Sequence, residues 1–185
     1  IPGAYGMSPR PFLLRNAGSN DWVDVTTEAL GTQGMINDAQ WVDINNDQMT
    51  DLVLAGEWMP ITVYTNDNGT LSRTKTIPNS SGWWNCISVH DLDGNGYQDM
   101  VFGNWGQNMK YQASMERPMK IYLRDFDKNG RPEGLLEWFA PGDDKAYPFH
   151  NRHDLTSQMP SLKKNGLKYA DFAQKQIKDL FAPEV

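Results

Sequence analysis

Short runs of apolar and β-branched residues, separated by turns rich in Gly, Asn and Asp, fill the chain between residues 12 and 138. Runs of this length bounded by turn residues are typical of β-strands. The first two runs, residues 12–16 and 22–26, flank Ala17-Gly18-Ser19-Asn20-Asp21, and this pattern predicts a β-hairpin. The strands predicted after it also come in pairs: 39–42 with 52–56, 61–64 with 71–74, 84–89 with 100–104, and 119–123 with 134–138.

The predicted strands form a repeating unit of four antiparallel strands. An acidic loop follows the first strand of each unit and begins at Asp43 and at Asp91, 48 residues further on. A third acidic loop begins only 34 residues later, at Asp125, and is expected between the third and fourth strands of the second unit. Four-stranded repeats of about 40–50 residues are typical of propeller blades. The sequence therefore predicts a mainly β fold, a partial β-propeller of about two and a half four-stranded antiparallel blades.

The pattern changes near residue 148, where apolar residues begin to recur at intervals of three and four. This spacing predicts α-helices over residues 152–159 and 169–181. Residues 1–10, in contrast, are rich in Gly and Pro and are expected to form a tail or linker. We therefore predict three parts: a linker over residues 1–10, propeller-blade repeats over 11–147, and a short helical C-terminal segment over 148–185.

The three acidic loops place oxygen-bearing side chains at positions one, three, five and nine. These residues are Asp43, Asn45, Asp47 and Asp51 in the first loop, Asp91, Asp93, Asn95 and Asp99 in the second, and Asp125, Asp127, Asn129 and Glu133 in the third. Alternating oxygens on a tightly turned loop point to one centre, which suits a hard cation such as Ca²⁺. Position seven, Tyr97 in the second loop, would add its backbone carbonyl. The second loop is the strongest candidate, because Pro132 and Glu133 make the geometry of the third less certain.

These loops differ from the calcium loop of EF-hands. Their position twelve is Leu54, Phe102 or Leu136 instead of Glu, and predicted strands flank them instead of helices. We expect bound calcium to lock each hairpin and to have no catalytic role, because ligands from one loop saturate the ion. The alternative is an ordinary Asp/Asn/Gly turn that holds no metal. The same ligand spacing in three loops favours the cation site.

Composition narrows the function further. The chain has 185 residues, 39% of them hydrophobic and 22% charged, as expected for a folded domain of this size. The net charge of −6 argues against a nucleic-acid partner, and no apolar run is long enough to span a membrane. A single cysteine excludes an internal disulfide. Because the chain starts at Ile1-Pro2-Gly3, we expect a piece of a longer, processed protein.

Four of the seven tryptophans, Trp58, Trp83, Trp84 and Trp105, lie close to the ends of predicted strands. At such places they could form an aromatic platform that stacks on a sugar ring. The alternative, which we favour from the sequence, is packing between blades, because large aromatic side chains fill the space between sheets.

Several motifs resemble a known repeat family. Asp91–Asp99 followed by Met100-Val101-Phe102-Gly103 resembles the FG-GAP/VCBS repeat of integrin α-subunit propellers and of many secreted bacterial proteins. Other motifs are similar to repeat proteins associated with the ASPIC/UnbV domain: Ala55–Pro60, Gly82–Asn85, Gly103–Asn108, Arg152–Leu155, Gln158–Pro160 and Tyr169–Phe172. The resemblance implies a propeller and cation ligands at the loop positions named above. The first loop departs from the pattern, because Gln48 stands where the family usually has glycine.

These observations predict a non-enzymatic, calcium-stabilised β-propeller repeat module of a secreted or cell-surface protein. Its expected location is extracellular, at the cell surface or periplasmic, and its expected partners are a surface protein or a glycan and the remaining blades of its parent protein. We identify no catalytic residue. One alternative is a carbohydrate-active enzyme that uses carboxylates such as Glu57 or Glu116 near the tryptophans. Another is a purely architectural scaffold that displays a neighbouring domain.

Overall fold

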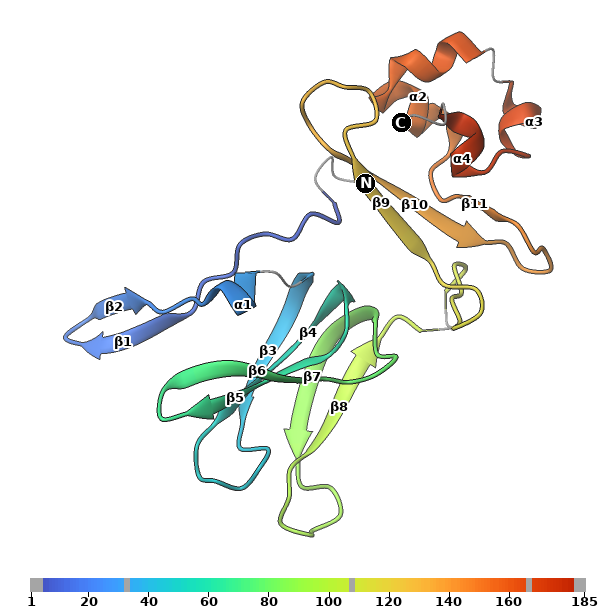
Figure 1. The fold of residues 1–185 in the computed structure, drawn as a ribbon. Helices are drawn as coiled ribbons and strands as arrows, with labels where there is room; N and C mark the ends of the chain where they lie inside the picture. Colours follow the sequence, from blue (N-terminus) through green and yellow to red (C-terminus); the bar gives the residue numbers. More distant parts are fainter. Residues whose placement is uncertain (1–4, 32–33, 107–108, 166–167, 182–185) are drawn as a thin grey trace. The chain divides into compact units, whose positions relative to one another are not determined.

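The computed structural model describes residues 5–31, 34–106, 109–165 and 168–181 (Figure 1). Strands greatly outnumber helices in the part of the chain that the structure describes, which confirms the mainly β fold. The chain forms two compact units, Ser8–Trp105 and Ile1–Met7 with Gly106–Val185. Three predicted features lie outside the described residues: the terminal Ile1-Pro2-Gly3, the pair Gln107-Asn108, and residues 166–167 with 182–185 of the C-terminal segment.

The Ser8–Trp105 unit begins with the predicted hairpin. Its strands are β1 (Leu14–Gly18) and β2 (Asp21–Asp24), and the short helix α1 (Glu28–Gly31) follows. A six-stranded antiparallel sheet comes next (Figure 1). Its strands are β3 (Met35–Val42), β4 (Asp51–Met59), β5 (Thr62–Asp67), β6 (Thr70–Thr76), β7 (Gly82–His90) and β8 (Asp99–Asn104).

Strand β4 is the centre of this sheet. It pairs with β3 along most of its length, with β5 through its first half and with β7 at its end. Because neighbouring side chains in a strand face opposite sides, Val53 and Ala55 enter one apolar cluster while Leu52 and Leu54 enter another. Both faces of β4 are therefore buried, and each fully buried Leu or Val contributes roughly 1.5–3 kcal/mol.

The second unit combines a three-stranded sheet with short helices. Its strands are β9 (Lys120–Arg124), β10 (Glu133–Phe139) and β11 (Ala146–Pro148), and its helical elements are α2 (Arg152–Gln158), the 3₁₀ helix η1 (Pro160–Asn165), α3 (Tyr169–Phe172) and α4 (Ile177–Leu180). The helices bury apolar residues against β10, where Leu135 packs with Leu155, Met159 and Leu180. The β9–β10 hairpin therefore depends on the helical segment for its core.

The sheets do not support the count of two and a half blades. Strands β3–β6 form one four-stranded antiparallel meander, as predicted for the first unit. The second predicted unit, residues 84–138, does not form one sheet: β7–β8 joins β4, whereas β9–β10 joins β11. The third acidic loop therefore connects the first two strands of a separate sheet. The division between units accordingly falls near residue 105, inside the predicted repeat region of residues 11–147.

The C-terminal helices are shorter than predicted. Helix α2 matches the predicted helix over 152–159, and the side chain of Asn151 caps its first turn. The predicted helix over 169–181 is instead two single-turn helices, α3 and α4. The chain is extended at Gln176, where a capping box with Asp179 starts the second of them. Within the described part of the chain, no helix is both long and apolar enough for a membrane span.

Candidate cation loops and aromatic cluster

All three acidic loops have one hydrogen-bonding pattern, which begins with the carboxylate at position one. In the second loop, Asp91 Oδ1 accepts the N–H of Asn95 at 3.1 Å and Oδ2 accepts the N–H of Gly96 at 2.8 Å. The equivalent bonds measure 3.1 and 2.8 Å in the first loop and 2.9 and 2.8 Å in the third. The spacing found in the sequence therefore corresponds to one repeated loop conformation.

The other ligand positions repeat as well. Position three accepts the N–H of position five at 3.0–3.1 Å, and position five accepts the N–H of position seven at 2.8 Å in each loop. Position nine closes the loop by accepting the N–H of position two at 2.8–3.1 Å. Tyr97, the predicted carbonyl ligand, donates its N–H to Asn95 Oδ1 in this pattern. The backbone donors hold the oxygens of all four positions in place.

Positions four and six of each loop have left-handed backbone conformations. In the second loop they are Gly94 (φ 74°) and Gly96 (φ 87°), for which such angles are unstrained. In the first loop they are Asn46 (φ 59°) and Gln48 (φ 71°). The missing glycine at Gln48 therefore does not change the loop conformation, although a residue with a Cβ costs about 1–2 kcal/mol there.

The second and third loops each gather three carboxylates. The ligand oxygens of Asp91, Asp93 and Asp99 lie within 4.8 Å of one another, as do those of Asp125, Asp127 and Glu133. Oxygens around one Ca²⁺ ion lie about 2.3–2.6 Å from it, so a mutual separation below about 5 Å fits a shared ion. The third loop thus gathers its carboxylates as the second does, despite Pro132 and Glu133.

The first loop differs in where its carboxylates stand. Position three is Asn45, and the third carboxylate, Asp47, is at position five. Asp43 and Asp51 keep places equivalent to those of the other loops, so two carboxylates remain where the second and third loops have three. The first loop therefore has the same donor set, three carboxylates and one amide, but in a different order, and its carboxylates are not among the groups whose oxygens lie within 4.8 Å of one another.

The three loops also differ in how deeply the carboxylate at position nine is buried. Asp51 is 0% exposed, and its second oxygen accepts the N–H of Asn66 in β5 at 2.9 Å. Glu133 is 3% exposed, whereas Asp99 is partly exposed. Asp51 therefore has two backbone donors, one per oxygen, and ties the first loop to the neighbouring strand. A buried carboxylate with this support has a structural role that needs no metal.

Positive charge does not compensate these side chains. Among residues 5–31, 34–106, 109–165 and 168–181, no Lys, Arg or His forms an ion pair with any carboxylate of the three loops. Carboxylates brought this close repel one another unless a cation or a proton lies between them. The all-oxygen donor set and its uncompensated charge both fit a hard cation.

Three of the four predicted tryptophans form a cluster. The ring centroids of Trp58 and Trp83 lie 5.6 Å apart, and those of Trp83 and Trp105 lie 5.9 Å apart, both edge to face. Trp105 also donates its backbone N–H to the carbonyl of Trp83 at 3.3 Å. Trp58 and Trp83 are half-buried, and 55% of Trp105 is exposed. The cluster therefore presents aromatic surface at the β4–β7 end of the sheet.

Trp84 lies on the opposite face of β7. Its indole N–H donates to the carbonyl of Ser80 at 2.6 Å, and its ring packs on Phe102 beside an apolar core. It therefore serves packing, as the alternative interpretation of the tryptophans predicts. The two-residue alternation of a strand already places Trp83 and Trp84 on different faces, and this signal in the sequence could have separated them.

Trp58 has a strained backbone. It occupies a β-bulge where the register between β4 and β7 shifts, and its φ is 60°. A bulky residue with positive φ is an outlier that costs about 1–2 kcal/mol. Such strain is common at binding sites, where it aims a side chain that the regular strand would turn elsewhere.

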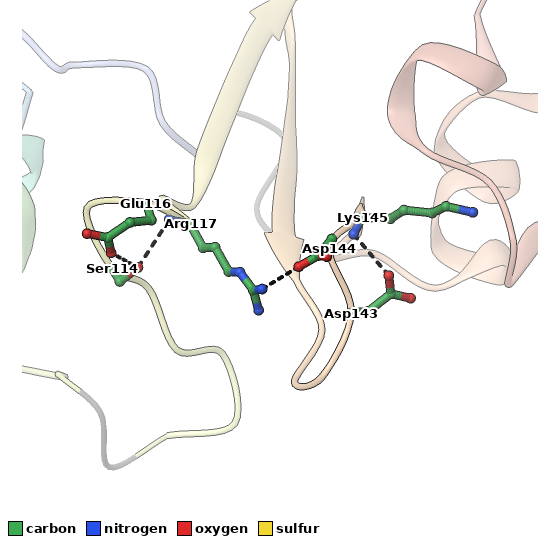
Figure 2. Close-up of polar contacts among 6 residues, drawn as sticks. All are labelled: Ser114, Glu116, Arg117, Asp143, Asp144 and Lys145. Atoms are coloured by element: carbon green, nitrogen blue, oxygen red, sulfur yellow. Dashed lines mark hydrogen bonds and ion pairs between the residues drawn. The ribbon is translucent and has the colours of Figure 1, made fainter.

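The two carboxylates of the enzymatic alternative lie in different units. Glu57 is half-buried next to Trp58 and lies 3.5 Å from the amide nitrogen of Asn37. Glu116 is in the other unit, where it accepts the hydroxyl of Ser114 at 2.9 Å (Figure 2). Hydrogen bonds from the backbone and from Ser114 hold the pKa of Glu116 below its usual range. A general acid for glycoside hydrolysis needs the opposite shift.

Glu137 on β10 is a buried carboxylate that the sequence analysis does not identify. Its carboxylate lies opposite Lys120 in the β9–β10 hairpin and accepts the hydroxyl of Tyr122 at 3.3 Å. The hairpin was predicted, and counting its register would have paired these residues across the strands.

Comparison with known proteins gives one match. A family model described as FG-GAP-like repeat matches residues 43–102, which contain the first two acidic loops, strands β4–β7 and most of β8. The match covers about a third of the chain, and it shows that this part of the chain is similar to FG-GAP-like repeats. No curated protein and no solved structure matches the chain.

Proposed function

Starting from the FG-GAP-like repeat at residues 43–102, we propose that this protein is a calcium-stabilised repeat module of a secreted or cell-surface protein. It binds a protein or a glycan and catalyses no reaction. The observation that carries the proposal is the repetition of one loop conformation three times, with three carboxylates gathered in two of the loops. Membership of the ASPIC/UnbV-associated group and completion of a propeller by further blades are part of the same proposal.

The second loop would hold its ion with Asp91, Asp93, Asn95 and Asp99. The third would use the equivalent Asp125, Asp127, Asn129 and Glu133. Calcium supplies positive charge between carboxylates that otherwise repel, so it stabilises the connection of the two strands that each loop joins. Backbone N–H groups already orient these oxygens, so little ordering is needed on binding.

The location follows from the expected affinity. Calcium sites of extracellular modules have dissociation constants of about 10⁻⁴–10⁻³ M, and fill only where calcium is abundant. We assign the second and third loops to this weak range as part of the same proposal. The negative net charge and the absence of a disulfide-forming pair are compatible with an extracellular, cell-surface or periplasmic site.

Thermal unfolding with and without calcium tests the proposal. At a free calcium concentration of about ten times Kd, each occupied site adds roughly 1.4 kcal/mol to the free energy of unfolding. We expect a higher Tm in calcium than in EDTA, and a smaller rise for Asp93→Asn, which gives the second loop the asparagine that the first loop has at position three. Asp67→Asn, an acidic residue outside the loops, is the matched control and keeps the full rise. Equal Tm values in calcium and EDTA would refute the calcium part.

The tryptophan cluster supports binding over catalysis. Trp58, Trp83 and Trp105 offer aromatic surface for stacking, and Glu116 has the wrong pKa shift for an acid catalyst. A glycan array and a hydrolysis assay on the same polysaccharides distinguish the two functions. Binding without product release supports the proposal, whereas turnover that Glu57→Gln abolishes would replace it with the enzymatic alternative. If this protein bound neither a glycan nor a surface protein, the third alternative, an architectural scaffold that displays a neighbouring domain, would replace the proposal.

A further inference from the structure

The unit that contains β9–β11 and the C-terminal helices has a cavity of 510 Å³. It is lined by residues of β9, β10, β11 and α4, among them Lys120, Tyr122, Glu137 and Lys178. Ligand pockets of small molecules are usually about 300–1,000 Å³. The cavity therefore has the size of a binding site. The third acidic loop contributes Phe126 to its lining, and the tryptophan cluster contributes no residue.

The hairpin register places a polar cluster on the wall of this cavity. Lys120 lies directly opposite Glu137 in the β9–β10 pair, and Tyr122 lies two residues along the same face. The Lys120 ammonium is 3.9 Å from Glu137 Oε1, and the Tyr122 hydroxyl donates to the same oxygen at 3.3 Å. The Glu137 side chain is only 11% exposed. Because both contacts use Oε1, Oε2 is left as an acceptor for a ligand.

Both acidic residues of the lining have a cationic partner within the protein, and Lys178, at an exposed position of α4, is the remaining charged residue of the lining. Glu137 pairs with Lys120, and Asp144, the other acidic lining residue, forms an ion pair with Arg117 (Figure 2). A strongly charged ligand of either sign would meet a charge of its own sign on the wall of the cavity, either Glu137 or Lys120. A zwitterion would have to separate the Lys120–Glu137 pair before each of its charges found a partner. A neutral ligand with groups that both donate and accept hydrogen bonds can bind this pair without separating it.

The remaining lining is aromatic. Phe126, Phe139 and Phe181 line the cavity, and the rings of Phe126 and Phe181 lie 4.6 Å apart. Flat apolar rings beside a carboxylate, an ammonium group and a phenol form an amphipathic site. The C–H face of a pyranose ring stacks on such rings while its hydroxyl groups face the polar side.

We propose that this cavity binds a neutral pyranose unit, with Glu137 Oε2 and Lys120 contacting neighbouring hydroxyl groups and a phenylalanine beneath the ring. The inference rests on the glycan-binding part of the proposed function and makes it specific to one site. Because Phe126 of the third acidic loop lines the cavity, the sugar affinity is measured both in calcium and in EDTA. Failure of the calcium-dependent Tm and failure of sugar binding can then be distinguished.

Saturation-transfer NMR on the whole chain tests the inference with a panel of neutral hexoses and their disaccharides. A single sugar ring of about 12 heavy atoms is expected to bind with Kd on the order of 1 mM. Glu137→Gln keeps the shape of the side chain but removes its charge, and should weaken binding about tenfold or more. Glu116→Gln, an exposed carboxylate outside the cavity, should bind like the unmodified protein. Lys178→Ala, at an exposed position of α4, provides a second cavity variant if Glu137→Gln does not fold, and should reduce saturation transfer.

Three results would overturn the inference. One is the absence of saturable transfer to any sugar in the panel while the protein is folded. Another is sugar binding that both Glu137→Gln and Lys178→Ala leave unchanged, which would place the sugar elsewhere, for example on the tryptophan cluster. The third is tighter binding of zwitterionic amino acids than of any neutral sugar, which would assign the cavity to a different class of ligand.

Discussion

Replacing Asp51 with alanine should be the most damaging single change at position nine of the loops in the Ser8–Trp105 unit. Asp51 is 0% exposed, and its two oxygens accept the N–H groups of Ile44 at 3.1 Å and Asn66 at 2.9 Å. Asp51→Ala would leave both donors without a partner in a buried place. Hydrogen bonds to a charged group contribute about 1.5–3 kcal/mol each, so we expect a loss of roughly 3–5 kcal/mol. Domains of this size have about 5–15 kcal/mol in total.

Asp99 is the matched control, because it holds the same position in the second loop. It accepts one N–H, from Leu92 at 2.9 Å, and it is partly exposed, so water can replace it. In EDTA, where calcium makes no contribution, Asp99→Ala should cost only about 1 kcal/mol. The ratio of the two losses in unfolding free energy therefore measures the combined effect of the second N–H donor to Asp51 and of its burial.

Urea denaturation followed by tryptophan fluorescence measures both variants. Six of the seven tryptophans lie in the Ser8–Trp105 unit, so fluorescence reports mainly on the unit that carries both residues. With a slope of about 1–2 kcal/mol per molar urea, the midpoint of Asp51→Ala should fall by roughly 1.5–5 M. Equal midpoints for Asp51→Ala and Asp99→Ala in EDTA would refute the argument from burial and donor number.

Two further predictions concern strain and pH. Because Trp58 has a φ of 60°, Trp58→Gly should be about 1 kcal/mol less destabilising than Trp58→Ala, although both remove the same ring; equal urea midpoints would exclude strain at this residue. Burial lowers the pKa of His150 below 6.5, so its protonation favours the unfolded chain. The free energy of unfolding of its unit should therefore decrease as pH falls below about 6.5, until the folded-state pKa is passed. Circular-dichroism melts between about pH 7.5 and about pH 5.5 measure this dependence, and His150→Gln should reduce it. A variant with the full pH dependence would rule out His150 as its source.

Local features of the fold could be predicted from the sequence because they depend on neighbours in the chain. The hairpins follow from apolar runs around turn residues, and the acidic loops follow from alternating oxygens whose donors lie in the same nine residues. Even Gln48, which departs from the expected glycine, adopts the left-handed conformation of the repeat. The hydrogen bonds at positions one and nine therefore outweigh the local preference of this residue.

The assembly of hairpins into sheets could not be predicted in the same way. Whether β7–β8 joins β4 depends on the pairing of Glu57 with Trp83, which are far apart in sequence, and on the bulge at Trp58. Periodicity does not encode such long-range pairing. Strands β9 and β10 leave the predicted blade because Leu135 finds its apolar partners in the helices, such as Leu155 and Ile177.

Other differences had signals in the sequence. The side chains of Gln176 and Asp179 have the spacing of a capping box, which marks a helix start inside the region predicted as one helix. Adjacent tryptophans in a strand cannot share a face, so only one of Trp83 and Trp84 could join a common cluster. Counting the register of the predicted hairpin would have placed Glu137 opposite Lys120. In each of these cases a local rule predicts the observed structure, whereas the periodicity of the whole chain predicts a different one.

The acidic loop keeps one conformation in different parts of this protein. The bonds from Asp91 and Asp93 to the backbone begin and end within the loop itself, so most of its shape is set by its own residues. The same nine-residue design accordingly serves a six-stranded sheet twice and a three-stranded sheet once. This local control of shape explains how one loop conformation occurs in two sheets of different size.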